Sequence, residues 1–407
     1  MSNNILKADV TIIGAGLVGL SAAVAMCKAG YEVILVDQHT QVTDDQVPES
    51  DVDWDQRIYA ISPKNAQWLT GLGVWQLLDT SRIGEMQSME IWGDATDMPL
   101  SLFAEDVNAN DLGFIAEERA LKKALMQQVQ ACGVRTLFGN KCITISATPN
   151  KAILELDNQQ FLESSLLIAA DGVNSWVRER LGIAIGQKDY HQTAIVANFI
   201  TENSHGNIAR QWFRRDGAGK DGGKKHCGIL AWLPLPGNKI SIVWSAPTEY
   251  ANVLMQLDAL ALTNEVMQAG NAELGQLTMI GEPAAFPLVL KKSEIFIQDC
   301  VVLAGDAAHR IHPMAGQGVN LGFRDIVDLT EILASRHSCQ PINDSGLLKR
   351  YARARKADLS NMLMMTNGLY HLFESENAVV KKVRNWGLSA TNRPVIKKML
   401  VKRAVAL

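Results

Sequence analysis

Residues that could do chemistry are most concentrated in the stretch GDAAHRIHPMAGQGVNLGFRD, residues 305–325. Asp306, His309 and His312 follow one another at intervals of three residues, and three such side chains are enough in number for a catalytic zinc. The local sequence argues against a metal, because Pro313 biases His312 away from helical conformation and no other cluster supplies ligands. Acid/base chemistry by His309 or His312 is a second interpretation. A cradle for a flat cofactor ring is the third.

The glycines in the second half of this stretch favour the cradle. A short buried strand, residues 301–304, delivers Asp306 to a loop, where its carboxylate can accept a hydrogen bond from a sugar hydroxyl. Gly316 and Gly318 then open a helix whose apolar stripe begins at Val319. Glycines allow a flat ring to lie against the backbone, and the free amides and the helix dipole stabilise negative charge on that ring. A reduced flavin carries such a charge.

A second motif, GAGLVG, lies near the start of the chain between an apolar, β-branched run and a segment of small helix formers. A second apolar strand follows and ends at Asp37, 18 residues after Gly19, which is near the spacing expected for a carboxylate that binds a ribose. The three glycines allow a tight turn, the approach of a pyrophosphate, and close packing of helix and strand. The motif therefore predicts a dinucleotide site without separating NAD from FAD. Its residues are Gly14, Gly16, Leu17, Val18 and Gly19, with Asp37 and Gln38 at the strand end.

A further glycine match, GAGKDG at residues 217–222, is rejected as a nucleotide site. Charged residues surround it, no buried strand leads into its first glycine, and a strand-like segment follows it. We interpret it as a mobile hairpin loop. The chain is thus predicted to hold one nucleotide-binding domain and no separate domain for a nicotinamide.

The elements that must position these motifs indicate an α/β protein. Pro63 is expected to open a helix that ends near Gly71, and Arg119 to start another. Between about residues 190 and 285 the alternating segments predict an antiparallel sheet with one covered face, suited to roof a substrate. CVVLAGD, residues 300–306, then reads as a parallel-type buried strand, so the nucleotide domain is interrupted by the sheet. Three tryptophans in the sheet, Trp212, Trp232 and Trp244, are expected either to line a pocket or to fill the core.

Composition restricts the class of protein. The 407 residues are 47% apolar and 20% charged, which allows a large core in two or more subdomains. No secretory signal and no membrane-spanning run is visible, and six scattered cysteines without a CxxC pair suit a reducing compartment, so we expect a cytoplasmic protein. The net charge of −4 argues against a nucleic-acid partner.

The end of the chain has a different charge. Residues 378–407 contain eight Lys or Arg and no acid, mixed with apolar residues. This composition suits peripheral contact with an anionic membrane or docking of a partner protein, and a solvated helix face explains it about equally well.

The motifs together carry a resemblance to a known family. HPMAGQGVNLGFRD, residues 312–325, resembles the pattern HPxAGQGxNxGxxD of the ubiquinone-biosynthesis hydroxylases, the UbiH/UbiI/UbiF group of FAD-dependent aromatic monooxygenases. GAGLVGL, DGVNSWVR (residues 171–178) and GDAAHRIHP are similar to the three fingerprints of that superfamily in order and spacing. DQRIYAIS and LAWLPLPGNKISIVWS add support, and the similarity covers nearly the whole chain.

The resemblance implies a fold of the para-hydroxybenzoate hydroxylase type, a Rossmann-like FAD-binding domain interrupted by an antiparallel substrate sheet. The implied division is residues 1–185 and 286–335 for the FAD-binding domain, 186–285 for the substrate domain and 336–407 for a helical, basic C-terminal region. FAD would extend from the first glycine turn to the GQG helix, with Asp306 on the ribityl chain. The implied cofactor-binding residues are Gly14, Gly16, Leu17, Val18, Gly19, Asp37, Gln38, Arg57, Arg119, Asp171, Arg178, Asp306, Pro313, Gly316, Gly318, Val319 and Asn320.

The reaction implied by the resemblance is hydroxylation of a polyprenyl phenol in ubiquinone biosynthesis. NAD(P)H would reduce FAD, and dioxygen would add to give a flavin hydroperoxide that attacks the ring, so a dedicated acid/base residue need not exist. Asp171 and Arg178 would contact both FAD and the transient nicotinamide, while surface ion pairs remain an alternative for Arg57 and Arg119. Other phenol hydroxylases, a reductase, or a flavin-stabilised scaffold within a quinone-biosynthesis complex remain open alternatives.

Overall fold

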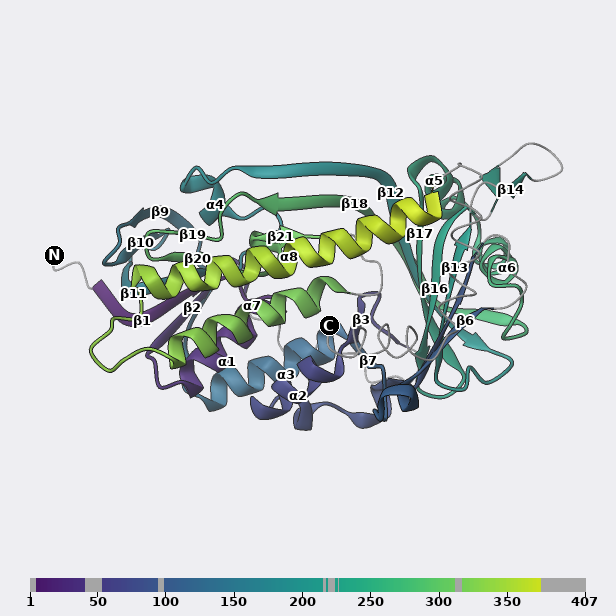
Figure 1. Ribbon diagram of the computed structural model, residues 1–407, viewed down its shortest axis with the longest axis horizontal. Helices are drawn as coiled ribbons and strands as arrows, with labels where there is room; N and C mark the ends of the chain where they lie inside the picture. Colours follow the sequence, from purple (N-terminus) through teal and green to yellow (C-terminus); the bar gives the residue numbers. More distant parts are fainter. Residues whose placement is uncertain are drawn as a thin grey trace.

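Two large sheets organise an elongated molecule, and the long helix α8 (Ser345–Glu374) runs past both of them (Figure 1). The computed structural model describes residues 5–40, 53–93, 99–214, 217–218, 224–225, 227–311 and 317–374. The predictions made for His312, Pro313, Gly316 and the basic segment 378–407 therefore lie outside the described residues.

The first sheet brings the ends of its parallel strands to one edge. β1 pairs in parallel with β2 and β11, and β11 pairs in parallel with β20, so the predicted return strand joins the nucleotide-binding sheet. Asp37, Asp171 and Asp306 lie at or just after the carboxyl ends of β2, β11 and β20, where open α/β sheets bind ligands. The strands are β19 (Ile297–Gln298), β20 (Val301–Leu303), β11 (Phe161–Ala169), β1 (Ile5–Ile13), β2 (Val33–Asp37) and β8 (Arg135–Phe138) in spatial order, with β10 (Ala152–Leu156) and β9 (Cys142–Ala147) extending from β11.

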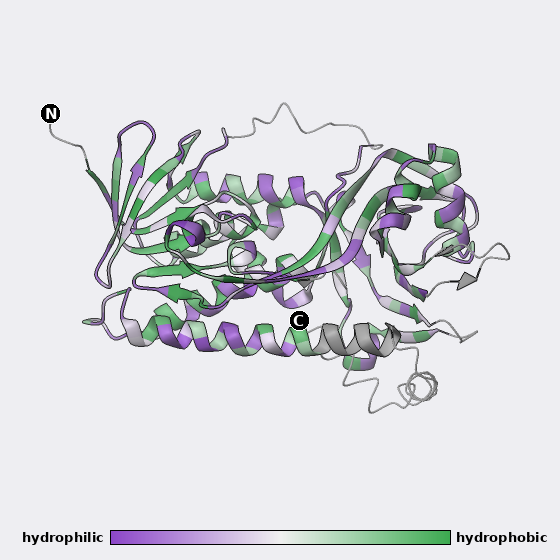
Figure 2. Ribbon diagram, turned by 90° about the horizontal axis from the view of Figure 1, so that it is seen from above, coloured by the Kyte–Doolittle hydropathy of each residue, from purple (hydrophilic) through white to green (hydrophobic). Residues whose placement is uncertain are grey.

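Helices beside this sheet bury their apolar stripes in one core. α1 packs against α3 and α7, and α7 packs against α8. Leu121, Leu125 and Val129 form a buried stripe on α3. Helix α2 spans Pro63–Gly71 as predicted, and the Ser62 hydroxyl caps its first turn. Bands of polar and apolar residues alternate along α8 (Figure 2). The helices are α1 (Leu17–Lys28), α2 (Pro63–Gly71), α3 (Glu118–Ala131), α4 (Trp176–Arg180) and α7 (Gln317–Ala334).

The second sheet, called the roof sheet below, is larger than the predicted segment 186–285. Two strands from earlier in the chain, β5 and β6, extend it, and β13 pairs with β5 in parallel while the other pairs are antiparallel. In spatial order it holds β21 (His309–Arg310), β18 (Leu277–Ser293), β12 (Ile185–Thr201), β17 (Lys239–Pro247), β16 (Gly228–Leu235), β13 (Ile208–Arg214), β5 (Ser88–Trp92) and β6 (Leu100–Phe103).

One face of the roof sheet carries a tryptophan-rich core. Trp212, Trp232 and Trp244 are all at most 1% exposed, and Trp212 and Trp232 meet edge to face with ring centroids 4.8 Å apart. Gly270, just after α6, lies so close to Trp232 that a Cβ there would overlap the indole. The core interpretation of the three tryptophans is therefore correct and the pocket interpretation is wrong. The helices on this core are α5 (Thr248–Met255) and α6 (Ala259–Ala269).

Small elements complete the described structure. A three-stranded sheet of β3 (Ile58–Ile61), β7 (Gly113–Glu117) and β4 (Gly84–Met86) lies between the two large sheets (Figure 1), and β14 (Gly217–Ala218) pairs with β15 (Lys224–Lys225) in the predicted hairpin. The short 3-10 helices are η2 (Trp75–Leu77), η3 (Thr80–Arg82), η4 (Ala104–Val107) and η5 (Gly305–Ala307). Among the described helices, none is both long and apolar enough to cross a bilayer.

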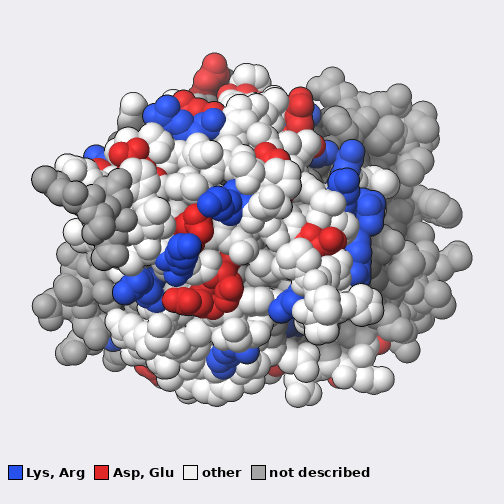
Figure 3. All heavy atoms as spheres, turned by 90° about the vertical axis from the view of Figure 1, so that its left-hand side faces the viewer, with Lys and Arg blue, Asp and Glu red and all other residues white. Residues whose placement is uncertain are grey.

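Charge is mixed at the end of the molecule that carries the first sheet. Basic and acidic side chains are neighbours near the middle of this face, and a row of basic side chains runs along its right-hand side (Figure 3). The Glu163 carboxylate pairs with both Lys7 and Lys151.

Candidate functional site

Gly14 and Gly19 pack too closely against backbone to carry a side chain. Gly14 has φ +102°, and a Cβ there would overlap the carbonyl of Ala170 at the end of β11. A Cβ on Gly19 would overlap the carbonyl oxygen of Gly14. These two glycines therefore let α1 approach the ends of β1 and β11.

Gly16 is open instead of crowded. It is exposed, and a Cβ there would meet no atom within 4 Å. It precedes α1 without a side-chain cap, and the first turn of the helix carries no acid. Leu17 is buried, and Val18 lies against Gly305, where a Cβ would come within 3.1 Å of it. The first turn of α1 thus leaves its backbone N–H groups free toward the open space at Gly16, as binding of a pyrophosphate requires.

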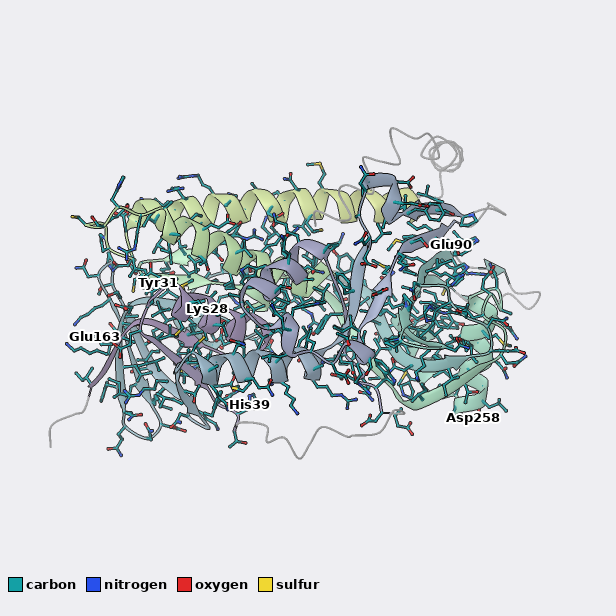
Figure 4. The ribbon with its side chains drawn as sticks, turned by 90° about the horizontal axis from the view of Figure 1, so that it is seen from below. Lys28, Tyr31, His39, Glu90, Glu163 and Asp258 are labelled. Atoms are coloured by element: carbon teal, nitrogen blue, oxygen red, sulfur yellow. The ribbon has the colours of Figure 1, made fainter. Side chains whose placement is uncertain are left out.

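Asp37 ends β2 beside this turn. Its Oδ2 accepts a hydrogen bond from the N–H of Ala15 at 2.6 Å, and its Oδ1 accepts from the N–H of His39 at 2.8 Å. The His39 ring lies at the surface (Figure 4), and Gln38 is exposed. The carboxylate is therefore held next to the glycine turn, and its contact with a ribose stays a prediction.

Asp306 follows β20 and is exposed to solvent. Solvent reaches its side chain, yet desolvation by surrounding protein raises the pKa of the carboxyl, against the opposing charges of Arg310, His309 and Arg57. We infer from this combination that Asp306 lies at the base of a concavity, which we call the Asp306 recess.

Arg57 connects the Asp306 recess with the roof sheet. Its Nη1 donates to Oε2 of Glu118 at 3.4 Å, and the Tyr59 hydroxyl donates to the same oxygen at 3.2 Å. On its other side, the Arg57 Cζ lies 5.4 Å from the centre of the Phe286 ring in β18. Burial and the Glu118 charge raise the pKa of Tyr59 well above its usual range, so the hydroxyl stays protonated. The alternative ion pair of Arg57 is present, and its contact with a cofactor stays a prediction.

Arg119 is enclosed by acceptors of the protein. Its Nη2 donates to Oε1 of Glu117 at 3.0 Å and to the backbone carbonyl of Asp53, and its Nη1 donates to Oδ2 of Asp53 at 3.3 Å. Glu117 is 1% exposed and also accepts from Nε of Arg82 at 2.7 Å. The structure therefore gives Arg119 an ion-pair role at the start of α3, and a cofactor contact remains a prediction.

Asp171 and Arg178 link two of the predicted fingerprints. Nη1 of Arg178 donates to the carbonyl of Ala307, within η5, at 2.8 Å. Oδ2 of Asp171 accepts from the N–H of Val177 at 3.1 Å, while its buried Oδ1 has no hydrogen-bond partner among the described residues. Burial raises the pKa of this carboxyl. A buried acceptor without a partner fits a donor from a bound group.

Asn320 joins α7 to the segment after β3. Its Nδ2 donates to the carbonyl of Ala60 at 2.7 Å, and its Oδ1 accepts from the N–H of Ser62 at 2.9 Å. Asn65 also donates to Oδ1. The side chain thus fixes the position of α7, so only the backbone here is left to border a ring. Of the neighbouring predicted residues, Gly318 is half-buried with open space at its Cβ position and Val319 is buried in the core.

His309 is buried and contacts a carboxylate. It is 2% exposed, and its Nε2 lies 2.9 Å from Oδ2 of Asp325. In the described part of the chain, no group of three or more His, Cys, Asp or Glu side chains could hold a metal ion. The metal and cradle interpretations depend on His312 and Gly316, which lie outside the described residues, so both stay predictions.

Several residues at the site were not predicted from the sequence. Asp325 closes the family pattern, but its contact with His309 across 16 residues has no local signal. Gly322 lets α7 approach α1, since a Cβ there would overlap Val18. Glu117 stands before the predicted Arg119, and a buried acid beside an arginine at a helix start could have indicated a pair.

The residues present fit an extended FAD. The open helix N-terminus suits its pyrophosphate, the unpartnered Asp171 oxygen and the Asp306 recess suit its hydroxyls, and both lie along one edge of the first sheet. Residues 7–366 match the family model described as FAD binding domain. The chain belongs to this family.

Curated relatives identify the group within the family. The chain is 31% identical to the 3-demethoxyubiquinol 3-hydroxylase of Escherichia coli over 98% of each chain. It is 31% identical to the ubiquinone hydroxylase UbiL of Rhodospirillum rubrum, over 95% of this chain and 86% of the relative. It is 29% identical to the human ubiquinone biosynthesis monooxygenase COQ6, over 94% and 89%. The resemblance to the ubiquinone-biosynthesis hydroxylases is thereby confirmed.

Solved structures show the same fold. The p-nitrophenol 4-monooxygenase PnpA of Pseudomonas putida superposes with a TM-score of 0.77 over 98% of both chains at 15% identity. PqsL of Pseudomonas aeruginosa superposes with a TM-score of 0.71 over 95% of this chain and all of its own at 20% identity. The predicted fold class is confirmed. The chain is a flavin-dependent monooxygenase that uses FAD.

Proposed function

We propose that this monooxygenase hydroxylates the aromatic ring of a polyprenyl phenol in ubiquinone biosynthesis, with NAD(P)H and dioxygen as co-substrates. The observation that carries the proposal is the apolar face that the roof sheet turns toward the Asp306 recess. The names of the Escherichia coli and human relatives, both of which concern ubiquinone, support this class of substrate.

That apolar face lies opposite the tryptophan core. In the register of the sheet, Val196 of β12 lies between Val243 of β17 and Ala284 of β18, and Val243 lies beside Ala231 of β16. All four are half-buried. Because side chains alternate along a strand, their sequence neighbours fill the core on the other side. Those neighbours include Ile195, Leu230, Trp232, Ile242 and Trp244.

The same face points toward the cofactor site. Phe286 of β18 pairs in register with Ala194 of β12, one row along from Val196 and Ala284. Its ring contacts Arg57, whose positive charge acts to lower the pKa of Asp306. Small and branched apolar side chains without charge suit an aromatic ring that carries an isoprenoid chain.

FAD supplies the redox and oxygen-transfer chemistry when it is bound. The turn at Gly16 and the recess at Asp306 would hold it along the first sheet. The apolar face of the roof sheet would orient the phenol and keep water from the reacting atoms. This division of roles assigns no general acid or base to the chain.

NAD(P)H would bind transiently, without a domain of its own. Within the described residues, the one strand–glycine–helix turn that opens on the sheet edge is the turn after β1. The other glycine match contributes to the hairpin of β14 and β15. Asp171 and Arg178, at the same edge as Asp306, are the proposed contacts for the nicotinamide.

The test is coupled turnover by the purified holoenzyme. On addition of a short-chain prenyl phenol, we expect NAD(P)H oxidation to accelerate, dioxygen to be consumed, and the product to gain 16 mass units, the mass of one oxygen atom. Oxidation of NAD(P)H that continues at the same rate without dioxygen would identify a reductase instead. Quinone precursors that accumulate in a deletion strain would name the ring position. Full rescue of that strain by a variant whose FAD cannot be reduced would favour a scaffold.

A pair of valines tests the apolar face itself. Val243→Trp would fill the proposed substrate space and should raise the KM for the phenol at unchanged FAD content. Val253→Trp, on α5 with 55% of the residue exposed, is the matched control and should leave the KM unchanged. Equal KM values in both variants and the wild type would exclude this face as the substrate surface.

The basic segment 378–407 is proposed to bring the enzyme to its lipid-soluble substrate. The proposal places the protein in the cytoplasm, peripheral at the inner membrane face or in a complex with other quinone-biosynthesis proteins, and its support is the composition of the segment. Anionic liposomes should bind the full chain and release it when residues 378–407 are removed. Unchanged binding to liposomes and partner proteins after that removal would refute the proposal.

A further inference from the structure

A buried carboxylate lies behind the loop that carries Asp306. Asp325 of α7 is fully buried, and its Oδ2 accepts from the N–H of Gly305 at 2.7 Å. Nε2 of His309 lies 2.9 Å from the same oxygen, and Nε of Arg355 donates to Oδ1 at 2.6 Å. One carboxylate therefore contacts both ends of the loop Gly305–His309, whose second residue is Asp306.

Helix α8 holds the same segment at a second point. The Tyr351 hydroxyl donates to the carbonyl of Leu303 at 2.9 Å, at the end of β20. Arg355 follows one turn later, and its remaining nitrogens pair with Asp328 at 2.7 Å and Asp358 at 2.8 Å. Helix α8 therefore contacts β20, the strand before Asp306, directly through Tyr351. It contacts the loop Gly305–His309 indirectly, because Arg355 binds the Asp325 carboxylate of α7.

These side chains cannot reach a bound cofactor. Asp325 and Tyr351 are 0% exposed and Arg355 is 1% exposed, whereas solvent reaches Asp306. Burial alone would raise the pKa of Asp325, but the charges of His309 and Arg355 outweigh it and lower the pKa. The carboxylate therefore stays ionised, and removal of a partner would leave a buried charge uncompensated.

We propose that Asp325, Arg355 and Tyr351 are positioning residues, which fix the loop Gly305–His309 and thereby hold Asp306 in the geometry that FAD binding requires. The two contacts lie on either side of Asp306 along the chain, so together they limit both the position and the rotation of its backbone. This proposal concerns the binding of FAD, and it does not depend on which phenol is the substrate.

The experiment compares five variants of the full chain as apoproteins titrated with FAD, one of them the conservative substitution Arg355→Lys. Arg355→Met and Asp325→Asn break the buried pair, and Tyr351→Phe removes one hydroxyl while it keeps the volume of the ring. Arg324→Met is the matched control, because Arg324 is 8% exposed and pairs at 3.2 Å with Asp358, a carboxylate that Arg355 also contacts. FAD binding is followed by quenching of flavin fluorescence.

We expect the dissociation constant of FAD to rise about tenfold in Arg355→Met and Asp325→Asn, and less in Tyr351→Phe, as for loss of a charged and a neutral hydrogen bond. Amide hydrogen exchange in residues 304–309 of the apoprotein should accelerate in the same order. Arg355→Lys should recover part of the affinity. Arg324→Met should lower thermal stability without changing the dissociation constant.

Two results would overturn the proposal. The first is a dissociation constant within about twofold of the wild-type value in both Arg355→Met and Tyr351→Phe. The second is equal weakening by Arg324→Met, which would show a general effect of stability. If the variants of the buried pair do not fold, Tyr351→Phe tests the proposal through its dissociation constant for FAD and its amide hydrogen exchange in residues 304–309. The assay contains no phenol, so an error in the proposed substrate would not alter its outcome.

Discussion

The guanidinium carbon of Arg57 lies 5.4 Å from the centre of the Phe286 ring, and this contact joins the cofactor side of the molecule to the roof sheet. Arg57 immediately precedes β3, while Phe286 lies on the long strand β18. A cation over an aromatic face is attracted by the ring quadrupole. Arg57 is therefore one of the contacts between the roof sheet and the residues near Asp306, beside the pairing of β18 with β21.

This contact should be measurable as a coupling free energy. Arg57→Met and Phe286→Leu should each lower the free energy of unfolding, and the double variant should lose less than their sum by about 0.5 kcal/mol, because the arginine is partly exposed. Urea unfolding of the four proteins measures the difference. Arg336→Met combined with Phe286→Leu is the control, since Arg336 faces Tyr31 in the other domain, and this pair should be additive.

Substitutions at Gly16 and Gly19, in the turn after β1, should affect different properties: the first FAD binding, the second folding. Gly16→Ala adds a methyl group into open space, so the apoprotein should keep its free energy of unfolding while FAD binding weakens by about tenfold, or about 1.4 kcal/mol. Gly19→Ala should instead reduce the yield of folded protein, because its Cβ would overlap the Gly14 carbonyl. Unchanged FAD affinity in Gly16→Ala would contradict the assignment of the pyrophosphate to this turn.

Arg82 and Arg119 form a matched pair for the role of Arg119. Both donate to Glu117 and to the carbonyl of Asp53, so both Met variants should lose similar stability in thermal unfolding. The resemblance assigns a cofactor contact to Arg119 alone, so only Arg119→Met should also weaken FAD binding by about tenfold. Equal FAD affinities in the two variants would restrict Arg119 to its ion pairs.

Asn320 should contribute more to stability than an exposed asparagine with similar contacts. Asn320→Ala leaves the N–H of Ser62 and the carbonyl of Ala60 without their partners in a buried place, which should cost about 1–3 kcal/mol. Asn343→Ala also removes two bonds to backbone carbonyls, but at the surface, and should cost less than about 1 kcal/mol. Equal losses of unfolding free energy in the two variants would show that the buried contacts of Asn320 contribute no more to stability than the surface contacts of Asn343.

Cys142 should react slowly with alkylating agents. Burial and the charges of Asp171, Asp157 and Asp37 raise the pKa of its thiol to about 12. Because only the thiolate reacts, about one molecule in ten thousand is reactive at pH 8, and the rate should rise about tenfold per pH unit. Mass spectrometry after iodoacetamide treatment should find the exposed Cys339 modified first. Comparable rates for Cys142 and Cys339 at pH 8 would contradict this pKa.

The local patterns predicted much of the fold because they act over short distances. The glycine turn at Gly14, the helix from Pro63 to Gly71 and the parallel strand before Asp306 all follow from residues within one element or its caps. The joining of β5 to β13 depends on residues more than a hundred positions apart, so no local pattern indicated it. The contact of Asp325 with His309 was missed for the same reason: an acid on a helix does not show which partner the fold brings to it.

The roof sheet and the first sheet are connected by two continuous strands. β12 and β18 are each 17 residues long and pair with each other from Ile185–Ser293 to Thr201–Leu277, with register shifts after Asp189 and after Val196. A paired ribbon resists bending far more than two separate linkers would. We therefore expect the enzyme to admit its substrate without a hinge between the sheets, so that the spacing of ring and cofactor is set once, when the chain folds, and is the same in every catalytic cycle.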